Sequence, residues 1–135
     1  MCRLFIGAEP QLWEPQTRSM RLDGVSTSVR LERFFWAILE EIGRRDGLTL
    51  SQLVAKLSRE CAEAGHDPAN FASFLRVCCG RYQALQLSGE IPVARDVSIA
   101  SLDSERILER ERRRHVAALT PGRRQAETTS FSAIS

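Results

Sequence analysis

The side chains that most readily suggest chemistry are Cys61, His66, Cys78 and Cys79, which are ligand types for zinc. Structural zinc sites draw on closely spaced pairs of cysteine and histidine in four-coordinate sets. Here a C-x4-H pair is followed by two adjacent cysteines, a spacing that matches no usual site. The cysteines also fall on apolar stripes of expected helices, so we predict reduced, buried thiols, no metal and no cofactor.

A catalytic role for the two histidines finds no support in the sequence. Neither His66 nor His115 lies in a recognisable arrangement with a Ser or Cys nucleophile and an orienting acid. Glycine-rich phosphate loops are absent as well. The sequence therefore predicts that the protein is not an enzyme.

Arginine dominates the basic residues: 18 of the 19 Lys and Arg residues are arginine, against 17 Asp and Glu. Its guanidinium binds phosphate and carboxylate groups in bidentate geometry. The net charge is only +2, which excludes a polybasic protein that coats nucleic acid without sequence preference. Any contact with nucleic acid must therefore be local.

The length and composition describe one ordinary globular domain with a tail. The chain has 135 residues, of which 43% are hydrophobic and 27% charged. No apolar run approaches the roughly 18 residues that span a bilayer, and the apolar start is too short for a secretory signal. We expect a cytoplasmic protein with no membrane association.

The elements that must position these side chains begin with an irregular arm over residues 1–17. Asp23-Gly24 then separates two alternating runs, residues 18–22 and 25–31, which is a strong signal of a two-residue hairpin. In the second run one face is apolar and the other is polar. The polar face carries Ser26, Ser28 and Arg30.

Helical periodicity follows the hairpin. A first helix carries apolar residues from Phe35 to Ile42, and Thr49 with Gln52 forms a capping box for a second. Asp67-Pro68 starts an accessory helix over residues 67–88. Beyond Pro92, residues 93–135 form an arginine-rich tail that we expect to be partly helical and, after Pro121, disordered.

The strand from Thr27 to Glu32, the two helices and the turn Gly47-Leu48-Thr49 together resemble a ribbon-helix-helix domain of the Arc/MetJ/CopG type. Residues 18–88 further resemble a bacterial subgroup described as ribbon-helix-helix domain-containing proteins. The resemblance implies a mainly α fold with a short β ribbon. It implies a ribbon-helix-helix dimer over residues 18–63, with an additional C-terminal helix packed on the core.

A function in DNA binding follows from the resemblance, as a sequence-specific transcriptional regulator with an antiparallel ribbon in the major groove. It implies base contacts from Ser26, Ser28 and Arg30. Phosphate contacts would come from the start of the second helix and from the first strand, through Thr49, Leu50, Ser51, Arg18 and Arg21. The expected dimer core consists of Val29, Leu31, Phe35, Leu39, Ile42, Leu53, Val54 and Leu57.

Another role remains open at this point. If residues 18–22 pair with residues 26–31, the ribbon of the dimer becomes four strands wide, and a major groove about 12 Å across would not take it flat. The scaffold could instead serve as a protein-interaction module or an antitoxin-like protein with little DNA readout. A protein partner would then bind through residues 93–135.

Overall fold

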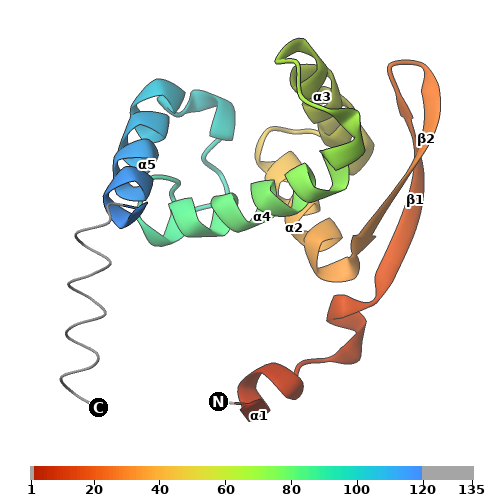
Figure 1. Ribbon diagram of the computed structural model, residues 1–135, viewed down its shortest axis with the longest axis horizontal. Coiled ribbons are helices and arrows are strands. Elements are labelled where there is room, and N and C mark those ends of the chain that lie inside the picture. Colours follow the sequence, from red (N-terminus) through yellow and green to blue (C-terminus); the bar gives the residue numbers. More distant parts are fainter. Residues whose placement is uncertain (1, 120–135) are drawn as a thin grey trace. The chain divides into compact units, whose positions relative to one another are not determined.

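The computed structural model describes residues 2–119, which divide into two units (Figure 1). The first unit extends to Ser101 and the second begins at Leu102. The first contains α1 (Cys2–Ile6), β1 (Pro15–Leu22), β2 (Val25–Glu32), α2 (Arg33–Arg45), α3 (Leu50–Glu63) and α4 (Phe71–Leu87), with single 3-10 turns at Pro10–Trp13, Pro68–Asn70 and Ile99–Ser101. The second contains α5 (Ser104–Leu119). The disorder expected after Pro121 falls on residues that lie outside the described range.

The two strands form the antiparallel hairpin that the Asp-Gly pair predicts. Asp23 and Gly24 both have positive φ, 52° and 78°, as a type I′ turn requires. Leu22 pairs with Val25, and the register continues without a bulge to Pro15 opposite Glu32. β1 thus begins three residues earlier than expected, so the arm before it is shorter than residues 1–17. That arm is also not irregular throughout, because it contains α1 and a 3-10 turn.

The inner face of the hairpin packs on the helices. Met20 and Leu22 from β1 and Val29 and Leu31 from β2 are buried in the core. Strand alternation puts Arg18 on this inner face as well, two residues before Met20. Arg18 therefore does not project outward as a phosphate contact would.

Helix α2 buries the expected Leu39 and also Trp36, which periodicity did not suggest. Trp36 and Leu39 are fully buried, whereas Phe35 and Ile42 are only partly buried against the core. The reason is β1, which continues past the expected arm boundary and supplies a partner for the indole: Trp36 Nε1 donates to the carbonyl of Gln16 at 2.9 Å. Of the expected dimer core, the residues buried within one chain are Val29, Leu31, Leu39, Leu53 and Val54; Phe35, Ile42 and Leu57 are partly buried.

A tight turn between α2 and α3 sets the direction of the second helix. Gly43 permits the close approach, since a Cβ there would lie 2.9 Å from the carbonyl oxygen of Leu48. Gly47 has a φ of 68°, which favours glycine at a helix end. The capping box at Thr49 is present, with its side chain accepting from Gln52 N at 3.2 Å.

Helix α4 is the accessory helix, and it packs on the same core through Leu75 and Cys79; Tyr82 and Leu85 are buried further along it. Asp67 caps the turn that precedes it by accepting from Ala69 N at 2.9 Å. The helix itself starts at Phe71, one turn later than residues 67–88 suggested, because Pro68–Asn70 form a 3-10 turn.

The segment after α4 packs back against the end of α2, although the sequence assigned it to the tail. The guanidinium of Arg45, at the end of α2, donates to the carbonyls of Ala94 (2.9 Å) and Val97 (3.0 Å). Asp46 accepts from the hydroxyl of Ser98 and from Ile99 N. We call residues 92–101 the strap. These bonds make the strap part of the first unit, so the packed region ends near Ser101 and not at Pro92.

Candidate nucleic-acid interface

The outer face of the hairpin is open and polar. Ser26, Ser28 and Arg30 of β2 are exposed and share this face, as the alternation predicts. β1 adds a second row of exposed side chains. Of these, the sequence pattern indicated only Arg21. The full set across the register consists of the pairs Thr17 with Arg30, Ser19 with Ser28, and Arg21 with Ser26.

Both carboxylates of the hairpin are held by arginines from the helices. Asp23 at the turn lies 3.7 Å from Arg59 of α3, and Glu32 at the other end lies 2.8 Å from Arg76 of α4. Arg21 and Arg30 form no ion pair within the described part of the chain. The exposed face therefore offers two cations and several hydroxyls, and each of the two carboxylates of the hairpin lies near an arginine.

Arg18 packs against α2 on the inner side of the hairpin, with its side chain 36% exposed. Its guanidinium carbon lies 5.3 Å from the centre of the Trp36 ring, a cation–π distance, and its Nη1 is 3.8 Å from Glu40. Its Nε is buried without a hydrogen-bond partner. Arg18 is thus separated from Arg21, the other arginine of β1 that was expected to contact phosphate.

The Glu32–Arg76 pair predicts a pH dependence of stability. The two hydrogen bonds from Arg76 lower the pKa of the Glu32 carboxyl, so the charged form is favoured in the folded state. The stabilisation is complete above the ordinary carboxyl pKa and is lost as pH falls through the lowered folded pKa. Because the pair is partly exposed, Glu32→Gln should cost about 1 kcal/mol at pH 7. Urea titrations at pH 7 and pH 3 check this: the difference from wild type should be smaller at pH 3 than at pH 7, and a constant difference would contradict it.

The start of α3 presents unpaired backbone donors. Thr49 N donates to Gln52 Oε1 at 2.9 Å, and Gln52 N donates to the Thr49 hydroxyl. The N–H groups of Leu50 and Ser51 belong to the first turn, where no intrahelical acceptor exists. Ser51 is exposed and Leu50 is partly buried. They lie at the positive end of a 14-residue helix.

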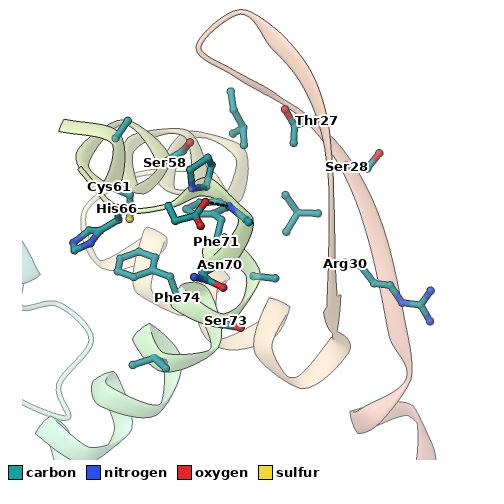
Figure 2. A pocket seen from close by; sticks show the side chains of 18 residues that line it. Thr27, Ser28, Arg30, Ser58, Cys61, His66, Asn70, Phe71, Ser73 and Phe74 are labelled. Carbon is teal, nitrogen blue, oxygen red and sulfur yellow. Dashed lines mark hydrogen bonds between the residues drawn. The ribbon is translucent and has the colours of Figure 1, made fainter. Parts of the chain in front are cut away.

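A groove of about 780 Å³ runs beside β2 (Figure 2). Its walls are β2, the end of α3, and the beginning of α4, where Phe71, Phe74 and Val77 supply apolar surface. Four consecutive β2 residues, Thr27 to Arg30, line it, so the strand meets the groove with its backbone edge. Figure 2 shows the side chains of Ser28 and Arg30 pointing away from the groove. In the described chain β2 pairs with β1 alone, which leaves this edge unpaired.

The comparisons with known proteins agree with this arrangement. The family model described as "Ribbon-helix-helix domain" matches residues 15–83, half of the chain. The chain belongs to the ribbon-helix-helix domain family. This confirms the resemblance and the fold class, mainly α with a β ribbon and an additional C-terminal helix. Ribbon-helix-helix proteins are in general DNA-binding regulators that act as dimers, and their fold is non-enzymatic.

One similar solved structure aligns with most of this ribbon-helix-helix chain. It is that of an uncharacterized protein from Bordetella pertussis Tohama I, which is 50% identical, with a TM-score of 0.74. The alignment covers 80% of this chain and 86% of that one. No curated protein matches the chain. Within residues 2–119, no helix is long and apolar enough to cross a membrane.

The cysteines of this ribbon-helix-helix domain lie on helix surfaces that face the protein. Cys79 is fully buried and its thiol donates to the carbonyl of Phe35 at 3.6 Å, while Cys61 and Cys78 are partly buried. Burial raises the pKa of Cys78 to about 11 and that of Cys79 to about 12. Both thiols are therefore protonated and weakly nucleophilic at neutral pH. No three potential metal ligands gather anywhere in the described region.

Proposed function

We propose that the protein is a dimeric, sequence-specific DNA-binding regulator that inserts a β ribbon into the major groove. The observation that carries this proposal is the outer hairpin face, which is open, bears two arginines outside any ion pair of the described residues and has both hairpin carboxylates close to arginines of the helices. Membership of a family of DNA-binding regulators supports it. A role on DNA would place the protein in the cytoplasm.

The proposed dimer forms through the unpaired edge of β2. A second copy of β2 in antiparallel orientation would satisfy the free backbone groups, which an edge strand otherwise leaves exposed. Apolar side chains that are incompletely covered surround this edge: Val25 is 63%, Phe34 40% and Val77 57% exposed. Because Phe34 is the second residue of α2 and follows β2 closely, pairing about the strand centre would bring it to the groove of the partner copy.

In this dimer, Ser26, Ser28 and Arg30 would face the base edges. Arginine can bind guanine O6 and N7 in bidentate geometry, whereas serine accepts or donates to almost any base edge. Arg30 would therefore contribute most of the discrimination. Thr49, Leu50 and Ser51 would hold a phosphate at the start of α3, and Arg21 would add a further contact.

Selection of binding sequences from a random duplex pool tests the proposal. We expect enrichment of a site with two inverted half-sites, because a two-fold symmetric dimer reads two copies of the same sequence. Affinity should fall steeply between low and moderate salt, as phosphate contacts require. Sedimentation equilibrium measures the dimer independently. A protein that binds no duplex at low salt would refute the DNA-binding function.

The variant Arg30→Ala should weaken binding to the selected site by about 1–3 kcal/mol per half-site, the contribution of one bidentate arginine–guanine pair. The loss should be concentrated at the guanine that Arg30 contacts, because base readout depends on position. Competition with duplexes substituted at each position measures this. Arg33→Ala, an exposed arginine at the start of α2, serves as a matched control. Equal losses on all sequences would make Arg30 a phosphate contact instead.

A second candidate is a protein-interaction module, and the width of the hairpin favours it. β1 pairs with β2 over its full length, so the ribbon of the proposed dimer has four strands. The arginine-rich α5 forms a unit of its own and is the candidate partner site within residues 93–135. A folded dimer without affinity for any duplex, together with stoichiometric binding of one protein that is abolished by removing residues 102–135, would support an antitoxin-like role.

A further inference from the structure

The strand β1 presents its own row of polar side chains beside those of β2. Thr17, Ser19 and Arg21 are exposed and alternate with inner residues of the strand. The register sets Ser19 directly opposite Ser28 at the middle of the hairpin, and Arg21 opposite Ser26 near its turn. Two of these side chains carry a hydroxyl group and the third a guanidinium. The outer face is therefore polar across both strands.

The width of the proposed dimer determines what β1 could touch on DNA. Joined through β2, the sheet would have the two β2 strands at its centre and one β1 strand at each side. Neighbouring strands lie about 4.8 Å apart, so the outer strands would be separated by roughly 14 Å. The major groove is about 12 Å wide. The central strands can enter it, whereas each β1 strand meets a rim of the groove, where the phosphates lie.

The side chains of β1 have the chemistry that a groove rim requires. Phosphate oxygens accept hydrogen bonds and repel carboxylates, and both Ser19 and Arg21 are donors. Arg21 gives one hydrogen bond from Nη1 to the carbonyl of Gly24 at 3.2 Å, which leaves most of its five N–H groups available. The nearby carboxylate of Asp23 is directed to Arg59, at 3.7 Å. No uncompensated acid therefore opposes a phosphate at this end of the hairpin.

We infer that β1 is a phosphate-binding strand, in which Arg21 and Ser19 grip the DNA backbone at the groove rims while β2 reads the bases. The inference rests on the proposed function and adds a division of labour to it. β1 supplies binding strength that is independent of sequence, and β2 supplies discrimination. The width of the hairpin is then an additional contact surface and not an obstacle to docking.

The salt dependence of binding tests the inference. Arg21→Gln removes one phosphate contact per protomer, so the slope of log affinity against log salt should become shallower by about 2 for the dimer. The sequences selected from a random duplex pool should stay those of the wild type. Gln83→Glu is the control: it lowers the net charge equally at an exposed position of α4, two turns beyond Arg76, and should leave the slope unchanged.

A second variant tests the centre of the strand. Ser19→Asp places a carboxylate at the rim, and we expect at least a tenfold loss of affinity on every duplex, with an unchanged dimer by sedimentation. A wild-type slope in Arg21→Gln, or an altered sequence preference, would overturn the inference and leave the DNA-binding function standing. If the wild-type protein bound no duplex, the proposed function itself would fall, and the inference with it.

Discussion

Replacing Trp36 by alanine should lower the free energy of unfolding by about 3–5 kcal/mol, the usual cost of deleting a large buried aromatic side chain. The Trp36 side chain is only 1% exposed and joins the inner face of the hairpin to α2. Its removal opens a cavity, leaves the carbonyl of Gln16 without its donor, and deprives Arg18 of the ring on which it lies. Urea denaturation of both proteins at the same concentration measures the loss, so that self-association of the folded state would contribute equally to both.

Trp36→Phe separates these contributions. Phenylalanine retains an aromatic surface for Arg18 but cannot donate to Gln16, so the free energy of unfolding should fall by about 1–3 kcal/mol. Trp13→Ala, which deletes the same side chain at a position that is 53% exposed, is the matched control. If Trp36→Ala were no more destabilising than Trp13→Ala, Trp36 would not be the anchor of the hairpin.

Arg45→Ala should be comparably destabilising, because Arg45 is a buried cation that fastens the strap. It is 6% exposed and donates to two strap carbonyls and, at 3.1 Å, to the hydroxyl of Tyr82. Tyr82 in turn donates to Glu41 at 2.7 Å. Hydrogen bonds to charged groups contribute roughly 1.5–3 kcal/mol each and are not additive, so we expect a total loss of about 3–5 kcal/mol.

Limited proteolysis distinguishes a detached strap from general unfolding. In Arg45→Ala, cleavage within residues 92–101 should accelerate under native conditions, while the hairpin and α3 remain protected. Arg44→Ala changes the exposed neighbour in the same turn and should alter neither property. Unchanged cleavage of the strap in Arg45→Ala would show that other contacts hold it.

Local signals account for the parts of the fold that the sequence predicted well. Asp23-Gly24 specifies its turn through positive φ at both residues, and the capping box at Thr49 specifies a helix start through side chains three residues apart. Alternation over residues 25–31 correctly separated the buried Val29 and Leu31 from the exposed Ser26, Ser28 and Arg30, although Val25 on the apolar side is 63% exposed. Each of these signals lies within a few residues of the structure that it determines.

The features that the sequence did not reveal depend on contacts between distant segments. Periodicity could not choose Trp36 over Phe35, because both lie near the apolar side of α2 and only the carbonyl of Gln16 decides between them. The strap resembles the beginning of a tail, since its fixation comes from Arg45, with separations of 49 and 52 residues in its two carbonyl bonds. Arg18 likewise reads as an exposed charge at the start of a strand when the strand is taken to begin there. Because β1 begins at Pro15, Arg18 lies within the strand.

The two-residue turn of the hairpin also constrains how such a surface can diverge during evolution. Side chains alternate along a strand, so inserting one residue between Val25 and Ser28 without a bulge would exchange the two faces of the rest of β2. Val29 and Leu31 would turn to solvent, and Ser28 and Arg30 would enter the core. The hairpin therefore tolerates substitutions on its outer face, whereas insertions and deletions within its strands would disrupt the core. Homologues that recognise different DNA sequences should differ in the side chains of this face while keeping the length of the hairpin constant.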